Sequence, residues 1–278
     1  HRTAVHAPKP YQKAMKMMVF PNETDFSPQP WVPRALAAYY TGYIDVMGAF
    51  DNFGSMFDAL FGEGTTGAWE GVVDGFKKGP YSPDVDLRQD IAAKLGNRIT
   101  LITDYELPIT PESERIVFAV QVTDEDRVAK ALAKLFEPDT EGPHPTRRTR
   151  TFKLPDGKEI IIWESLPVEK AAVPRISLEA LPPLRGEEDD EEVDVEQTPL
   201  FPNTSIAVAH GELFIASHLQ SLLKVLEHHE DRRETLGGTV DFKVVDATCL
   251  EIGAGQNCFR AFSRADEEYR PTYELIRQ

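Results

Sequence analysis

Hydrophobic side chains recur every three to four residues in the first third of the chain, a spacing that is typical of amphipathic helices. From Pro33 onwards this stripe consists of Leu36, Tyr40, Tyr43, Met47, Phe50, Phe57 and Phe61. It predicts one long helix, or two helices that are broken near Gly54. A shorter helix is expected around Trp69, Val72, Val73 and Phe76, and another around Leu87, Ile91 and Leu95 that ends at Gly96. We therefore predict a helical N-terminal region over residues 1–96.

The hydrophobic period changes from three-to-four to two after Asn97, which indicates strands. Strands are expected over residues 99–105, 115–122, 149–154, 158–163, 205–210 and 212–216. Pro155-Asp156-Gly157 and His210-Gly211 are turn sequences that close two of the resulting hairpins. Helices are expected around residues 128–135 and 219–226, with Thr123 or Asp124 as the N-cap of the first.

The fold class that follows from this order is α+β, with residues 97–278 forming an antiparallel sheet from strand–strand–helix units. The two helices share apolar offsets of 0, 3, 4 and 7, and Val128 is 91 residues before Leu219. Either the unit is duplicated, or the offsets are those of any amphipathic helix. A duplication predicts that the helices cover one face of the sheet.

The C-terminal part of the chain predicts a further helix, strand and helix. The first helix is marked by Phe242, Val245, Cys249 and Ile252 and ends at Gly253 and Gly255. Residues 258–262 are expected to form a short strand. Ser263 and Asp266 then form a capping box before a last helix, which contains Pro271. Residues 164–204 are rich in proline and acidic side chains, and we expect them to form an insertion or a surface excursion. We predict that the chain forms one compact unit, which is truncated at both ends.

The charge is strongly negative and excludes one class of partner. There are 30 Lys and Arg against 46 Asp and Glu, for a net charge of −16, and Glu187–Glu196 alone carries eight carboxylates. Because nucleic-acid binding requires clustered Lys and Arg, we expect no nucleic-acid partner. A solvated acidic loop is the simplest interpretation of the run; the alternatives are that it binds a cation, or that it lies against Arg147, Arg148 and Arg150.

Recognisable catalytic and metal-binding motifs are missing from the sequence. It contains neither GxSxG nor HExxH, and its His and Cys residues lack zinc spacing. Gly253-Ala254-Gly255 follows a helix, which is wrong for a dinucleotide loop. We therefore predict no catalytic residue, no metal ligand and no cofactor. Cys249 and Cys258 are either a possible disulfide, in an oxidising compartment, or two buried thiols.

The visible chain is not expected to span a membrane, because Arg34, Asp45, Asp51 and Asp58 interrupt its most apolar stretch, Trp31 to Phe61. It begins at His1 rather than Met, which indicates a processed or truncated piece.

Three segments together carry a resemblance. LGNRITLITDYELPITPESERIVFAVQVTDE, SIAVAHGELFIASHLQSLLKVLE and FRAFSRADEEYRPTYELIRQ resemble a family of uncharacterised exported proteins, signal-peptide or membrane-anchored, of planctomycete bacteria. The resemblance extends from about Tyr11 to Gln278 and is weakest over residues 138–204. It implies an extracytoplasmic location, periplasmic, cell-surface or secreted, and a longer parent chain. It implies no activity and no catalytic residue.

Two functional hypotheses follow. The first is a non-enzymatic cell-envelope protein that presents a binding or scaffold surface to a protein or an envelope polymer. The alternative is a carrier of an apolar ligand such as a lipid, whose cavity of roughly 300 Å³ or more would be lined in part by six aromatic residues: Tyr39, Tyr40, Tyr43, Phe50, Phe53 and Phe57. A hydrolase of unrecognised type is the third possibility.

Overall fold

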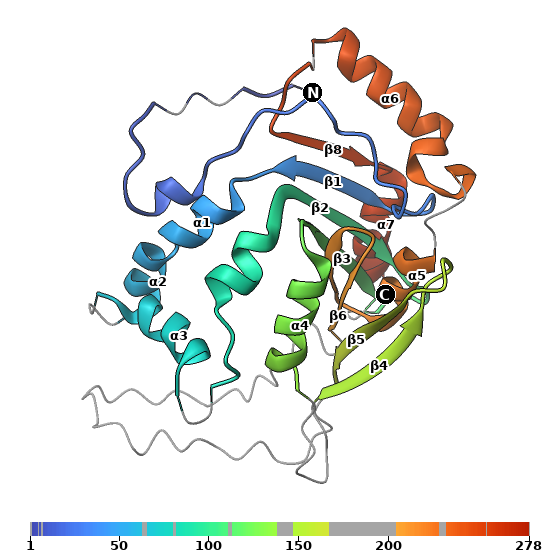
Figure 1. Cartoon of the computed structure of the whole chain (residues 1–278). Helices are drawn as coiled ribbons and strands as arrows, with labels where there is room; N and C mark the ends of the chain where they lie inside the picture. Colours follow the sequence, from blue (N-terminus) through green and yellow to red (C-terminus); the bar gives the residue numbers. More distant parts are fainter. Residues whose placement is uncertain are drawn as a thin grey trace, which may run out of the picture.

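A single antiparallel sheet forms the centre of the protein in the computed structural model, which describes residues 2–4, 6, 8–62, 66–79, 82–110, 113–137, 147–166, 204–227, 232–253 and 255–277. Eight strands of this part of the chain follow the order β4-β5-β6-β7-β3-β2-β1-β8 (Figure 1). Their bounds are β1 Ala38–Tyr43, β2 Leu95–Tyr105, β3 Glu114–Val122, β4 Arg147–Lys153, β5 Glu159–Ser165, β6 Ser205–Ala209, β7 Glu212–Ala216 and β8 Phe259–Ser263. The predicted α+β class with an antiparallel sheet is confirmed.

The helices connect or flank these strands. They are α1 Val46–Asn52, α2 Gly54–Phe61, α3 Ala68–Lys77, α4 Glu125–Leu135, α5 Leu219–Glu227, α6 Val240–Glu251 and α7 Ala265–Arg277. Single 3-10 turns cover Lys13–Met17, Ala92–Lys94, Arg232–Glu234 and Leu236–Gly238. The expected helices around Trp69, Val128, Leu219 and Phe242 are all present.

The start of the N-terminal aromatic stripe is a strand, which corrects the prediction of a continuous helix from Leu36. Residues Ala38–Tyr43 form β1, which pairs with β2 on one side and β8 on the other. Tyr39 and Thr41 are both 1% exposed. Aromatic and β-branched residues fit a paired strand well, and two neighbours satisfy its backbone groups. The predicted break near Gly54 is confirmed, because α1 ends at Asn52 and α2 begins at Gly54.

The segment before β2 also differs from the helix that was expected to end at Gly96. A π-helical turn covers Leu87–Ile91, and the Asp86 carboxylate caps it by accepting from the backbone N–H groups of Arg88 and Gln89. Strand β2 then begins at Leu95, so Gly96 lies inside a strand. A Cβ at Gly96 would be 2.5 Å from Gln121 Oε1. The glycine therefore makes room for a cross-strand side chain and is not a helix cap.

The hairpin predictions are confirmed, and their turns have the expected chemistry. His210 (φ 55°) and Gly211 (φ 75°) both have left-handed backbone between β6 and β7, as a two-residue hairpin with the right twist requires. Gly157 (φ 90°) serves the turn between β4 and β5 in the same way. Helix α4 is capped by Asp124, whose carboxylate accepts from Arg127 N.

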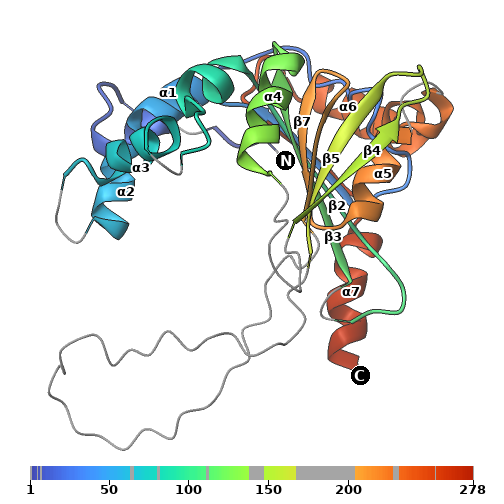
Figure 2. The same cartoon turned by 60° about the horizontal axis from the view of Figure 1, so that its bottom comes forward.

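Helices cover both faces of the sheet, which corrects the expectation of helices on one face. Leu222, Val225 and Leu226 of α5 belong to a core cluster with Ile162, Ala207 and Phe214. Val128 and Leu132 of α4 pack instead with Trp163, Val208 and Leu213. Because neighbouring strand residues point to opposite faces, α4 and α5 lie on opposite sides (Figure 2).

The same arrangement decides the question of a duplicated unit. Strand β3 pairs antiparallel with β7, so a symmetric duplication would relate the two hairpins by a two-fold axis perpendicular to the sheet. Such an axis keeps both helices on one face. The shared offsets are therefore those of two separate amphipathic helices.

The acidic run Glu187–Glu196, and most of the 164–204 insertion with it, lies outside the described residues.

Candidate interaction surface

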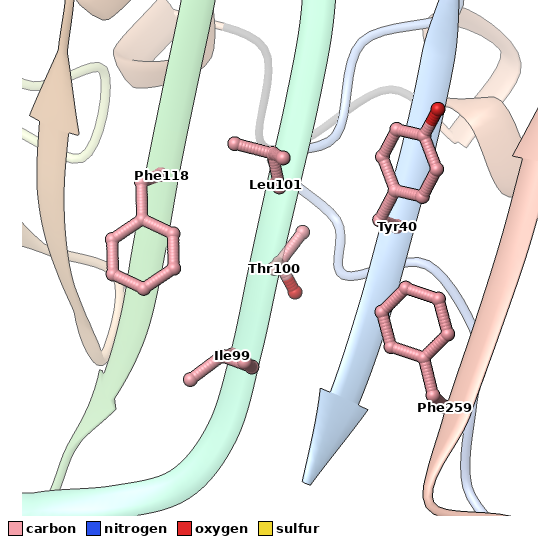
Figure 3. A pocket seen from close by; sticks show the side chains of 6 residues that line it. All are labelled: Tyr40, Ile99, Thr100, Leu101, Phe118 and Phe259. Carbon is pink, nitrogen blue, oxygen red and sulfur yellow. The ribbon is translucent and has the colours of Figure 1, made fainter. Parts of the chain in front are cut away.

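One face of the sheet carries a row of apolar side chains on four adjacent strands, which we call the sheet patch: Tyr40, Ile99, Leu101, Phe118 and Phe259 (Figure 3). The strand register brings them together, because Tyr40 is opposite Leu101 and Leu101 is opposite Phe118. They line an open depression of about 240 Å³ together with Thr100. The sheet patch is a shallow apolar surface, and Phe259 is 53% exposed.

A glycine on β1 shapes the aromatic end of the sheet patch. Gly42 is opposite Phe259 in the register of β1 and β8. A Cβ on Gly42 would be 2.8 Å from the Phe259 ring and 2.9 Å from the Cys258 carbonyl oxygen, closer than packed carbon atoms approach. The Phe259 ring therefore lies over a backbone without a side chain, and it stacks on Tyr40 with ring centres 6.2 Å apart. Two aromatic rings are thus held side by side at the surface.

Helix α7 is attached at one end of the sheet patch by two tyrosines. Tyr40 Oη donates to Glu268 Oε1 at 2.7 Å, and Tyr105 Oη donates to Glu267 while it accepts from Arg270 Nη1 at 3.2 Å. The hydrogen bond to Glu268, with burial as a second cause, raises the pKa of Tyr40 from 10 to about 12. Tyr40 therefore lines the sheet patch with its ring and holds α7 with its hydroxyl group.

The opposite face holds a buried polar cluster that the sequence analysis missed. Gln29 Nε2 donates to Thr100 Oγ1 at 2.9 Å and approaches Glu212 Oε1 at 3.5 Å, and Tyr39 Oη donates to Gln29 Oε1 at 3.4 Å. Arg98 Nη2 donates to the Ser27 carbonyl at 2.6 Å. These bonds hold the segment around residues 25–32 on the sheet.

Burial raises the pKa of Glu212 to about 7, while Gln29, the more distant Arg98 guanidinium and Trp31 act in the opposite direction. The Trp31 Nε1 atom is buried beside this carboxyl group, with no acceptor at the distance and angle of an ordinary hydrogen bond. Glu212 is 6% exposed. The only sequence signal for this cluster is a glutamate that begins an otherwise apolar strand, ELFIA. Because the side chain is buried among these partners, we interpret the cluster as a polar part of the core that titrates.

The six aromatic residues expected to line a carrier cavity are not brought together. Tyr39 is buried on the face opposite to Tyr40, whereas Phe50, Phe53 and Phe57 surround Trp69 at ring-centre distances of 5.7, 4.7 and 5.4 Å. A second depression, of about 460 Å³, is polar and lies along α4, where Asp90, Asp124, Asp126, Arg127, Lys130 and Lys134 line it with Val85 and Ala131.

Two of the three arginines that were considered as contacts of the acidic run share a different partner, Glu164. Arg148 donates to Glu164 Oε2, and Arg150 Nε donates to Glu164 Oε1 at 2.8 Å, so one carboxylate on β5 serves two arginines of β4. Glu164 is 5% exposed. The proposed contact with Glu187–Glu196 lies outside the described residues.

The candidate metal and sulfur ligands are dispersed. No group of three or more His, Cys, Asp or Glu side chains that could hold a metal ion occurs among the described residues. His210 lies in a turn, and His218 Nδ1 is 2.9 Å from Ser217 Oγ, with its pKa lowered mainly by burial. His228 and His229 are not described. Cys249 and Cys258 are half-buried free thiols in the structure.

Comparison with known proteins adds no further constraint, because no family model, no curated protein and no solved structure matches the chain. None of the described helices is both long and apolar enough to cross a bilayer.

Proposed function

We propose that this chain is a non-enzymatic, exported protein of the cell envelope that binds another protein through the sheet patch. The observation that carries the proposal is the apolar row on β8, β1, β2 and β3, which α4 leaves uncovered on its face of the sheet. Contiguous apolar patches larger than roughly a few hundred Å² are uncommon on monomeric proteins, and they frequently mark interfaces.

The chemistry of the sheet patch favours a protein over a sugar polymer. Recognition of a sugar polymer combines stacking on aromatic rings with hydrogen bonds to the sugar hydroxyl groups, yet only Tyr40 and Thr100 carry polar side-chain atoms among the lining residues. Both hydroxyls are engaged, that of Tyr40 by Glu268 and that of Thr100 by Gln29. The shallow shape also fits a broad protein surface better than an enclosed lipid chain, because ligand pockets usually bury most of their ligand.

Photocross-linking in cells tests the proposal. Phe118 is replaced by the photoreactive amino acid benzoyl-phenylalanine, and the same replacement at Val72 of α3, which is 38% exposed, serves as the control. We expect the Phe118 variant to form an adduct with a different protein, and the Val72 variant not to form it. Equal adducts at both positions would contradict the proposal, and an adduct with a lipid would replace it by the carrier alternative.

Export is tested separately, by fractionation of cells that express the protein from its own gene. We expect the protein in the envelope or secreted fraction. Recovery with a cytoplasmic marker would overturn the extracytoplasmic part of the proposal and leave the sheet patch as a binding surface.

A further inference from the structure

The outer edge of β8 has free backbone groups. Cys258 O accepts from Tyr43 N, and Arg264 N donates to Ala37 O. Cys258, Arg264 and every second residue between them therefore direct their backbone N–H and C=O groups towards β1. The backbone groups of Phe259, Ala261 and Ser263 must then point away from β1. No hydrogen bond to these groups occurs within the described part of the chain, where β8 is the last strand of the sheet.

The two edges of the sheet differ sharply in charge. The edge strand β4 carries Arg147, Arg148, Arg150 and Lys153, and such basic side chains prevent a sheet edge from pairing with another copy. The edge strand β8 carries one charged residue, Arg260, whose Nη1 is 2.7 Å from Asp246 Oδ1. Only β4 has the protection that sheet edges normally show.

Exposed apolar side chains concentrate on the elements around β8. Among the described residues, ten of the nineteen large hydrophobic side chains that are exposed lie between Val240 and Ile276, on α6, β8 and α7 or directly beside them. Examples are Val240 at 77%, Tyr269 at 66% and Ile276 at 82% exposed. Neither α6 nor α7 has a single buried residue. Both helices therefore present apolar surface outward, and α6 flanks the edge strand, since its Phe242 packs on Phe262 of β8.

We propose that β8 pairs antiparallel with β8 of a second copy of this chain, about a two-fold axis near Ala261. An antiparallel edge is self-complementary, because the same free groups meet on both strands. Helix α6 packs on the face of Tyr39 through Phe242, and α7 is anchored to Tyr40 on the other face. The axis thus brings the α6 helices of the two copies towards each other on the face of Tyr39, whereas α7 lies at β2 and projects away from the sheet (Figure 2).

The exposed apolar area beside the edge strand supplies most of a standard interface. If a large side chain presents about 150–200 Å² when fully exposed, the exposed parts of the six side chains from Val240 to Phe259 amount to roughly 500–650 Å² per chain. A standard interface buries about 800 Å² per partner, and the paired backbone of β8 adds to the side-chain area. The dimer goes beyond the proposed function, and it places Phe259 of the two copies near the axis, so that the two sheet patches become one continuous surface.

A proline substitution at the edge provides a selective test. In Ala261→Pro the lost N–H is one that points away from β1, so pairing within the chain is retained while pairing with a second copy is blocked. Thr151→Pro is the matched control, because the N–H of Thr151 points away from β5 at the other edge of the sheet. Leu154 N donates to Lys158 O across that hairpin, so Leu154 faces β5. Backbone groups alternate in direction along a strand, and Thr151, three residues earlier, therefore faces away from β5. Circular dichroism verifies that both variants fold.

The measurement is mass by light scattering at high micromolar protein concentration. We expect twice the chain mass of 31.2 kDa for the wild type and for Thr151→Pro, and the single mass for Ala261→Pro. Val244→Glu, at an exposed position of α6, should also shift the equilibrium towards the monomer, and it stays informative if Ala261→Pro fails to fold. A monomeric wild type, or a dimer that persists in the two β8-side variants, would overturn the proposal. Neither result affects the Phe118 adduct, so the two proposals fail independently.

Discussion

Replacing Glu212 by glutamine should abolish a pH-dependent loss of stability that the buried carboxyl group imposes. In the folded protein its pKa is about 7, against the ordinary value of 4.5. The folded state therefore holds the proton more tightly than the unfolded state does. The resulting stabilisation is complete below pH 4.5 and disappears as the pH rises through 7, where the folded protein must carry a buried carboxylate.

The magnitude follows from the size of the shift. Each pKa unit corresponds to 1.36 kcal/mol, so a shift from 4.5 to about 7 amounts to about 3 kcal/mol between acidic and alkaline conditions. This is a substantial fraction of the 5–15 kcal/mol that stabilises a typical domain. Glutamine has nearly the same shape, does not titrate, and can still accept from Gln29. The variant should therefore match the wild type near pH 4 and exceed its stability by about 3 kcal/mol near pH 8.

Urea unfolding followed by tryptophan fluorescence measures this difference, since Trp31 lies beside Glu212 and reports on its surroundings. Glu114→Gln, at an exposed position at the start of β3, is the control and should leave the pH dependence unchanged. The comparison between variants removes the contribution of all other titrating groups. The reasoning would be refuted if Glu212→Gln lost stability with pH as steeply as the wild type does.

Gly42 and the two cysteines provide two further tests. Gly42→Ala should lower the free energy of unfolding by about 1–3 kcal/mol, because the new methyl group would displace the ring of Phe259, and a thermal melt with a matched Gly255→Ala control, where no atom lies within 4 Å, measures it. Thiol labelling of the unreduced, denatured protein should modify both Cys249 and Cys258, because the structure has them as free thiols; a single species that resists labelling until it is reduced would show a bridge instead.

Local sequence determined those helices and strands whose hydrophobic period and flanking turn residues both indicate the same element. The alternating residues of β2 and β3, the Asp-Gly and His-Gly turns, and the helices α4 and α5 were all predictable, since side-chain period and turn backbone are set within a few residues. The break at Gly54 belongs to the same class. The antiparallel α+β character followed from these hairpins.

Tertiary pairing decided what the local pattern left ambiguous. Residues 38–43 satisfy a helical spacing, yet they lie between β2 and β8, where two neighbouring strands satisfy their backbone groups. A hydrophobic period cannot express this, because the partners come from positions about 60 and 220 residues away. The assignment of α4 and α5 to opposite faces also depends on which strands lie beneath each helix.

The candidate sites belong to the second category for the same reason. Tyr40 and Phe259 are 219 residues apart in the sequence, and only the strand order places their rings together. Glu212 looked like an ordinary polar residue after a turn, and its titration behaviour arises because the segment around Gln29 covers it. The sequence determined which residues are apolar or ionisable; the tertiary structure determined which of them meet, and whether water reaches them.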